Sequence, residues 1–415
     1  MLTSNDRVRL KKISRLIYRA SRKIKILRFL SWSSTVRYTF FRKKSEQLPS
    51  VVYPKFDSAE VFQDIKRARS MLGDTRFDNW LQNKIVDVEN GARLLESVGT
   101  KKFFTTSSKI YGKPKKMLRD GKTTPLKLSK QFSSLLRTED YWNQAPNKKT
   151  IPQEKIRNMI QLRCNDVFGK EGPKVIMVDS ISAKATASSR FIKLRKGASF
   201  YEKDIDQLFN HEALVHVATT LNGRKQDMVK ILGANYGSIT KTQEGLAVFS
   251  ELITGCMDVR RLNRILYRVL AIQMAIDGAD FIDLYRFFME RCRLKTEAFE
   301  NARRVFRGGV LSGGYPFTKD VVYLDGMVRV HNFFRTAIAL GRKDAMELLF
   351  IGKIDLDDIP ILLSLKKEGM IQKPKFVPYW IKDMNFLASF FALTTFMGDM
   401  DHSRASAYYE SLMKV

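Results

Sequence analysis

Two of the four histidines in the chain lie in one short run, His211-Glu212-Ala213-Leu214-Val215-His216. Residues 204–221 have helical periodicity, and on an ideal helix positions 211 and 216 lie about 140° apart. At that angle the two imidazole rings cannot reach one ion, whereas a π-bulge absorbs one residue and brings them back to one face. The run therefore predicts a π-bulge within residues 211–216. The alternative is a pair of unrelated helix histidines, and His331 and His402 are left unassigned as packed or surface residues.

Zinc is the cofactor that this histidine pair favours. Catalytic zinc takes three protein ligands and keeps a fourth position for water, so a third ligand is needed. We predict Glu244, in the segment Thr242-Gln243-Glu244-Gly245-Leu246-Ala247, because its small neighbours let two helices approach closely. Glu251 lies on roughly the same helix face, and it is an alternative ligand, a group that orients a histidine, or a surface acid. The prediction is one Zn²⁺ per chain, held by His211, His216 and Glu244.

Glu212 directly follows the first histidine of the run. A carboxylate in that position can take a proton from water held by the metal and pass it to a leaving amine. We therefore predict that Glu212 is the catalytic base of an amide hydrolysis.

The hydrophobic pattern divides the chain into three parts. We expect a basic amphipathic N-terminal arm at residues 1–50, a helical and basic loop-rich N-terminal lobe at residues 51–150, and a metallopeptidase catalytic domain at residues 151–415. The predicted fold class is α+β and predominantly α-helical, with a zincin-like catalytic domain whose HExxxH helix lies beside a small sheet. The catalytic part begins with short β-like segments at 175–178 and 190–194, and helical periodicity follows at 204–221, 244–254, 260–275, 281–293 and 321–340.

The N-terminal arm has apolar residues every three or four positions and an almost purely cationic opposite face, which predicts an amphipathic helix. The apolar positions are Leu10, Ile13, Ile17, Ala20, Ile24 and Leu27. One interpretation is that the apolar stripe packs on the body of the protein. The other is a peripheral contact of residues 7–30 with an anionic membrane, and the segment also resembles an organelle transit peptide.

Charge is the unusual part of the composition: 73 Lys and Arg against 43 Asp and Glu give a net charge of +30. Residues 1–50 and 101–150 carry most of this excess, which points to acidic partners. Three dispersed cysteines argue against a disulfide framework. No apolar run reaches the roughly 20 residues needed to span a bilayer, and we expect a cytoplasmic protein.

The motifs together resemble the QEGLA-motif family, which includes the microtubule-associated tyrosine carboxypeptidases and bacterial proteins labelled flavohaemoglobin-expression modulators. The resemblance covers about residues 55–390. It rests on the HExxxH run, Asn222-Gly223-Arg224, Thr242 to Val248, Arg307-Gly308-Gly309, Phe317 to Leu324 and Gly352-Lys353-Ile354. It implies a zinc metallopeptidase in which His211, His216 and Glu244 hold the metal and Glu212 is catalytic. In the animal members the implied activity is removal of the C-terminal tyrosine of α-tubulin.

A carboxypeptidase needs a fixed cation to receive the terminal carboxylate of its substrate, ideally an arginine. The candidates for substrate binding are Arg307, Lys319 and Arg329, with Arg307 or Lys319 preferred for the carboxylate, and Arg304 lies in the same stretch. Tyr323 is the candidate donor to the oxyanion of the tetrahedral intermediate. The β-like segment at 190–194 is either an edge on which an extended peptide adds as a strand or an ordinary strand.

The leading prediction is a zinc-dependent carboxypeptidase that removes a C-terminal residue, tyrosine or another aromatic, from an exposed acidic protein tail such as that of tubulin. The alternative is a nucleic-acid or anionic-membrane binding protein with a non-catalytic metal site, for which the two basic blocks are the motive. No RNA-binding module accompanies these charges, so nucleic acid is the less favoured partner.

Overall fold

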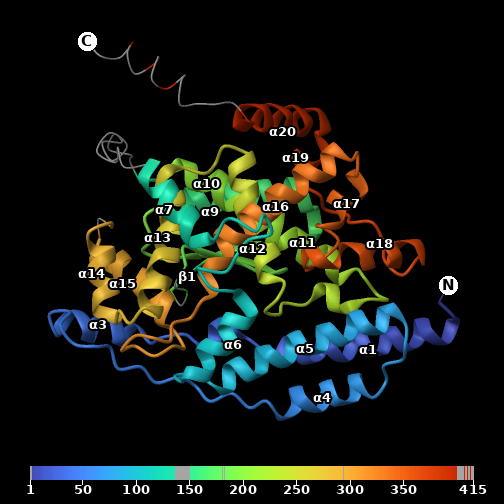
Figure 1. The fold of residues 1–415 in the computed structure, drawn as a ribbon, viewed down its shortest axis with the longest axis horizontal. Helices are drawn as coiled ribbons and strands as arrows, with labels where there is room; N and C mark the ends of the chain where they lie inside the picture. The colour runs from blue at the N-terminus through green and yellow to red at the C-terminus, as the bar shows by residue number, and fades with distance from the viewer. Residues whose placement is uncertain are drawn as a thin grey trace.

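The computed structural model describes residues 2–135, 150–179, 181, 183–292, 294–399 and the single residues 406, 409 and 412. Residues 136–149 of the predicted N-terminal lobe and His402 lie outside the described residues. Helices predominate, and a small sheet lies among them (Figure 1). The first part of the chain forms α1 (Ser4–Lys23), α2 (Ile26–Phe29), α3 (Ser34–Arg42), α4 (Ala59–Arg69), α5 (Arg76–Glu96), α6 (Lys101–Tyr111) and α7 (Pro125–Leu135).

Helix α1 lies along the lower edge of the molecule in Figure 1, beside α4 and α5, and packs against both. Its apolar stripe is at most 3% exposed at Leu10, Ile13 and Ile17. These side chains belong to the same core as residues of α12. The interpretation that the stripe packs on the body of the protein is therefore confirmed. The apolar face of α1 is therefore not available for a membrane contact through residues 7–30.

Two capping boxes fix the start of α1 relative to α5. Thr3 accepts a hydrogen bond from the amide of Asp6, and Thr75 accepts one from the amide of Asp78. Arg9 then forms ion pairs with both capping aspartates. A capping box satisfies two free amides of a helix terminus, so the arginine joins two helix starts that are already rigid.

Residues 101–135 contain more helix than their lysine and proline content predicted. Phe103 and Tyr111 on the inner face of α6 are at most 1% exposed, and α7 packs against α13. The loop-rich part of the lobe among the described residues is therefore the connection between α6 and α7, at residues 112–124.

The sheet has three strands in the order β1-β3-β2. Strands β1 (Lys174–Val178) and β3 (Phe191–Arg195) are parallel, and β2 (Ala185–Ala187) runs antiparallel to β3. Because β3 has a neighbour on both sides, the prediction that residues 190–194 offer a free edge to a peptide is wrong. Helix α9 (Gln153–Phe168) packs against β1, and the helix that carries the two histidines packs against β2.

The rest of the chain is helical. Around the histidine run lie α10 (Glu202–Leu208), the π-helix η2 (Phe209–Val217) and α11 (Ala218–Arg224). They are followed by α12 (Thr240–Ile253), α13 (Val259–Ile276), α14 (Phe281–Met289), α15 (Lys295–Phe306), α16 (Val322–Ala339), α17 (Lys343–Leu348), α18 (Ile359–Lys367), α19 (Tyr379–Lys382) and α20 (Met384–Asp399). Short 3₁₀ turns are η1 (Gly169–Glu171), η3 (Lys230–Gly233), η4 (Lys319–Val321) and η5 (Leu356–Asp358).

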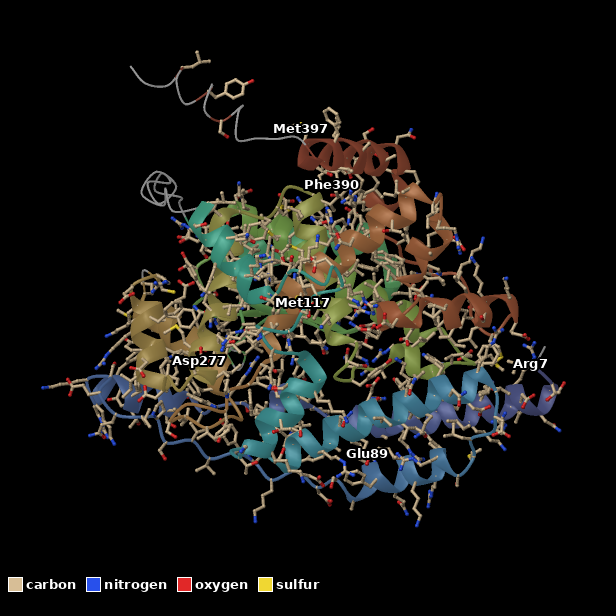
Figure 2. The ribbon with its side chains drawn as sticks, viewed as in Figure 1. Arg7, Glu89, Met117, Asp277, Phe390 and Met397 are labelled. Atoms are coloured by element: carbon tan, nitrogen blue, oxygen red, sulfur yellow. The ribbon has the colours of Figure 1, made fainter. Side chains whose placement is uncertain are left out.

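The predicted class, α+β and predominantly helical with a small sheet, is confirmed. Figure 2 shows Phe390 and Met397 on α20 at the upper edge of the molecule, opposite Arg7 and Glu89 on the helices of the lower edge. Among the helices of the described ranges, none is both long and apolar enough to cross a membrane.

Helices α12 and α16 cross in the middle of the molecule at a contact between two glycines. A Cβ added at Gly245 would overlap the backbone of Gly326, and one added at Gly326 would overlap the carbonyl oxygen of Lys241. The two backbones therefore approach more closely than any larger residue would permit. Since Glu244 is the neighbour of Gly245, this contact also sets the position of the predicted metal ligand.

We predict that Gly326→Ala lowers the free energy of unfolding by about 1–3 kcal/mol or more, because overpacking a tight contact forces the backbones apart. Gly398→Ala is the matched control, since Gly398 lies in α20 with open space around it. There the change should be neutral or stabilise by up to about 1 kcal/mol. Urea unfolding of both variants measures the difference, and equal stabilities would contradict the close approach of α12 and α16.

Candidate metal centre

The two histidines lie on a π-helix, η2 (Phe209–Val217). The ring centroids of His211 and His216 are 5.0 Å apart, and the rings are nearly perpendicular. The predicted π distortion is therefore confirmed, and it is longer than the single turn expected within residues 211–216. Its wider turn brings two imidazoles with a spacing of five residues to one face of the helix.

Neighbouring hydroxyl groups stabilise this irregular helix. Thr219 donates a hydrogen bond to the carbonyl of Val215 at 2.7 Å, and Thr220 donates one to the carbonyl of His216 at 2.6 Å. Serine and threonine bonds to preceding carbonyls are typical where a helix bends. The two threonines, three and four residues after His216, thus give hydroxyl partners to the carbonyls of Val215 and His216.

Glu244, near the start of α12, is the third member of the cluster. Its Oε2 lies 3.8 Å from Nε2 of His211 and 3.8 Å from Nε2 of His216. All three ligand atoms lie within 4.8 Å of one another. Around one tetrahedral zinc with bonds of about 2.0–2.2 Å, ligand atoms are roughly 3.4 Å apart. The two imidazole nitrogens each lie slightly farther than this from the carboxylate oxygen. A small inward shift of the side chains would fit the three atoms to such an ion.

Glu251 orients the first histidine. Its Oε1 lies 2.6 Å from Nδ1 of His211, and Arg261 donates two hydrogen bonds of 2.9 Å to the same carboxylate. Burial opposes ionisation, yet Arg261 and His211 hold the pKa of Glu251 at about 2. With the proton of His211 on Nδ1, its Nε2 is free to face Glu244. Glu251 was predicted to be a metal ligand, a group that orients a histidine, or a surface acid, and the structure supports the orienting role.

Lys319 orients the carboxylate of Glu244. Its Nζ donates a hydrogen bond of 3.0 Å to Oε1 of Glu244, which leaves Oε2 facing the two histidines. Although burial acts in the opposite direction, Lys319 and His216 keep the pKa of Glu244 well below its usual value. Lys319 was predicted to bind the terminal carboxylate of a substrate, but in the structure it is engaged by Glu244.

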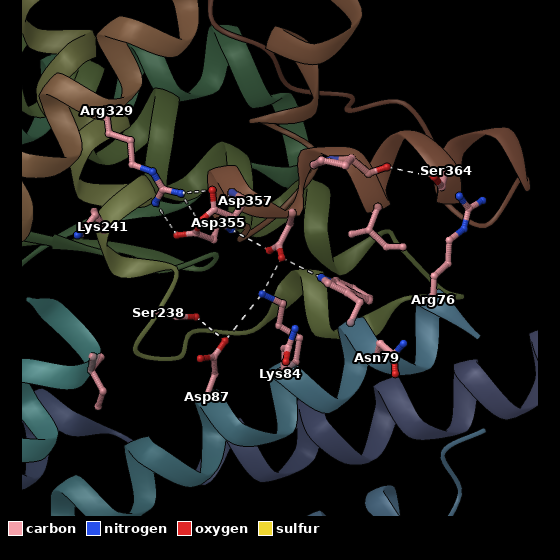
Figure 3. A pocket seen from close by; sticks show the side chains of 16 residues that line it. Arg76, Asn79, Lys84, Asp87, Ser238, Lys241, Arg329, Asp355, Asp357 and Ser364 are labelled. Carbon is pink, nitrogen blue, oxygen red and sulfur yellow. Dashed lines mark hydrogen bonds and ion pairs between the residues drawn. The ribbon is translucent and has the colours of Figure 1, made fainter. Parts of the chain in front are cut away.

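The other predicted substrate-binding cations lie in different surroundings. Arg329 pairs with Asp355 at 2.8 Å and with Asp357 at 2.8 Å. Figure 3 shows this pair at a cavity of about 600 Å³. Neither histidine nor Glu244 lines this cavity. The structure therefore does not bring Arg329 to the metal centre.

Arg307 is a buried cation without a counterion. It is 6% exposed, and its Nε has no hydrogen-bond partner in the part of the chain that the structure describes. Burial and the nearby Arg304 lower its pKa to about 10. Tyr323, the predicted oxyanion donor, is 9% exposed, and its hydroxyl accepts a hydrogen bond of 3.3 Å from Arg304.

Glu212 and Lys353 complete the surroundings of the histidines. Glu212 is 7% exposed, and its charge acts on both His211 and Lys353. Lys353 is 4% exposed. Burial lowers its pKa to about 8, against the opposing effect of Glu244 and Glu212. The sequence prediction did not include Lys353, although the Gly352-Lys353-Ile354 segment was among the motifs that carried the family resemblance.

The fold and the site define a predominantly helical α+β protein with a buried cluster of two histidines and one glutamate on neighbouring helices. The model of the microtubule-associated tyrosine carboxypeptidase family matches residues 38–399, so the chain belongs to that family. The family resemblance predicted from the motifs is thereby confirmed. A search of curated proteins finds no match to the chain.

We predict that Glu251→Gln weakens zinc binding by roughly 10- to 100-fold, because loss of an orienting carboxylate typically has that effect on a histidine ligand. Glu202→Gln at the start of α10 is the matched control, since its carboxylate is exposed and pairs only with Lys155 in the described chain. Competition with a chromophoric chelator measures both affinities. Equal affinities would contradict the orienting role of Glu251.

Proposed function

We propose that the chain is a zinc-dependent carboxypeptidase that removes a C-terminal tyrosine or another aromatic residue from an exposed acidic protein tail. The observation that carries the proposal is the convergence of His211, His216 and Glu244 within 4.8 Å, in a chain of a carboxypeptidase family. The name of the family points to a microtubule protein as the source of the tail. The active helix is then zincin-like, with a π-helical turn in place of the regular HExxH spacing.

The proposed ligands are His211 through Nε2, His216 through Nε2 and Glu244 through Oε2. Zinc bound there would polarise the scissile carbonyl and make water more acidic. Burial lowers the pKa of His216, which favours the neutral imidazole that a metal requires. The carboxylate of Glu251 and the ammonium of Lys319 hold two of the three ligands in orientation.

Glu212 is the proposed catalytic base. It follows His211 on the same helix, and it makes no ion pair with another described residue. Its carboxylate accepts a proton from the attacking water and passes it to the leaving amine. Tyr323 is the proposed donor to the oxyanion, and Arg304 and Lys319 close to it favour negative charge at that place.

The charge of the chain supports an acidic substrate. The net charge is +30, and such a field raises the rate of encounter with acidic tails. Of the three predicted substrate-binding cations, Lys319 and Arg329 form ion pairs, whereas Arg307 forms none with the described residues. We propose that it attracts acidic side chains that precede the C-terminal residue.

The alternative function, a nucleic-acid binding protein with a non-catalytic metal site, remains a prediction. Both versions, nucleic acid and anionic membrane, were predicted from the two basic blocks, and the apolar stripe of α1 that could have added to a membrane contact is buried in the core. Nucleic-acid binding that weakens as salt rises, without peptidase activity after zinc addition, would favour this alternative.

We predict that Glu212→Gln retains stoichiometric zinc and loses roughly 10²- to 10⁴-fold in kcat, the usual contribution of general acid–base catalysis. Elemental analysis measures the metal, and release of tyrosine from a short acidic peptide measures turnover. Chelation of the metal should abolish turnover of the wild type, and added zinc should restore it. A Glu212→Gln variant that hydrolyses at the wild-type rate would refute the mechanism.

We further predict that the wild type cleaves an acidic peptide with a free C-terminal tyrosine and leaves the same peptide with an amidated C-terminus largely intact. The reason is that a carboxypeptidase binds the terminal carboxylate through a fixed cation. Mass spectrometry of both digests gives the two rates. Equal rates would show an endopeptidase or aminopeptidase instead.

A further inference from the structure

Lys353 is a buried cation whose charge acts on residues of the metal centre, and it has no counterion among the described residues. It is 4% exposed. Its ammonium interacts with the charges of Glu244 and Glu212, yet it forms no ion pair or hydrogen bond that would neutralise it within the described ranges of the chain. An unpaired buried charge is costly, so a ligand that supplies negative charge at this position would be bound favourably.

The segment that carries Lys353 is held rigidly against the active helix. The amide of Lys353 donates a hydrogen bond of 2.6 Å to the carbonyl of Leu232. The same carbonyl lies so close to Gly223 and Gly352 that a Cβ on either glycine would overlap it. Asn222, at the end of the active helix, donates a hydrogen bond of 2.7 Å to the carbonyl of Phe350.

The other end of this segment is tied to α12, the helix of Glu244. Thr242 accepts a hydrogen bond of 3.0 Å from the amide of Leu356 and donates one of 3.2 Å to Asp355. Arg329 holds the same aspartate with two further bonds. Lys353 is thus fixed between the helices that carry Glu212 and Glu244, and the ion pair of Arg329 serves to fix this segment.

The chemistry of the proposed reaction places the terminal carboxylate near Glu212. If Glu212 passes a proton to the leaving amine, that amine lies within hydrogen-bond reach of its carboxylate, roughly 3 Å. The leaving amine and the terminal carboxylate are bonded to the same Cα. The cation that receives the carboxylate must therefore lie near both the metal centre and Glu212, and the charge of Lys353 interacts with Glu244 and with Glu212.

We propose that Lys353 binds the terminal carboxylate of the substrate and so determines that the enzyme cuts at a free C-terminus. This inference rests on the proposed carboxypeptidase function. It differs from the sequence prediction, which named Arg307, Lys319 and Arg329 for substrate binding. Lys319 is engaged by Glu244 and Arg329 by Asp355. The charged and polar groups that act on Arg307 are Arg304, Asp320, Tyr323 and Arg303.

The test measures binding, so that it does not depend on turnover. The zinc-loaded Glu212→Gln protein is titrated calorimetrically with a short acidic peptide ending in tyrosine, as the free acid and as the C-terminal amide. We expect the free acid to bind roughly 10- to 100-fold more tightly, the value of a charged hydrogen bond. Adding Lys353→Met should remove this preference, and Lys353→Arg should keep part of it. Arg307→Met is the comparison: because Arg307 is proposed to attract the preceding acidic side chains, its loss should weaken binding of both peptides alike and keep the preference.

Steady-state kinetics of the active enzyme, which keeps Glu212, gives the second readout. Lys353→Met should raise KM for the free acid by a similar factor and change kcat less, with zinc content and melting temperature near those of the wild type. An unchanged preference in Lys353→Met, or its loss in Arg307→Met, would overturn the inference. A preference that depends on Lys353 in a protein that cleaves neither peptide would support the carboxylate site and refute the proposed function.

Discussion

The one additional residue between His211 and His216 is the constraint on which the centre depends. A regular helix would direct the two rings away from each other, and the chain forms a π-helix over Phe209–Val217. Irregular backbone of this kind persists only where its surroundings compensate for it. Here the compensation comes from hydroxyl groups on the next turn, from the sheet beside the helix and from α12, which presents Glu244 at the required distance.

Charges around the centre follow a common arrangement. Each acid that faces a histidine is itself held by a cation from another helix or turn: Glu251 by Arg261 of α13, and Glu244 by Lys319 of η4. Removing such a pair of charges from water costs free energy. The attraction between the charges offsets this cost only when their geometry and hydrogen bonds are good. They also fix each carboxylate in one orientation. The result is a rigid cluster in which η2 and α12 carry the three candidate ligands, and α13 and η4 carry the cations that orient the acids.

The sequence predicted the parts of the structure that depend on local spacing. The π distortion and the helical class follow from residue types at short intervals, and Glu244 was predicted from the small residues beside it in a separate segment. What it missed depends on contacts between distant segments. Arg329 has a partner in Asp355, and no local pattern shows this. Strand β2 is only Ala185–Ala187, too short and too weakly apolar to detect, yet it makes β3 a central strand. Lys353 is an isolated lysine in a loop, whose burial only the folded chain reveals.

The part of the chain that defines the family and the part that folds together do not coincide. The family match begins at residue 38, whereas α1 ends at Lys23 and contributes Leu10, Ile13 and Ile17 to the main core. Each such side chain contributes about 1.5–3 kcal/mol when fully buried. A recombinant protein trimmed to the family boundary would thus expose a face of α4 and α5 that water does not reach in the whole chain. If such a protein failed to stay in solution, that result would say nothing about the metal centre.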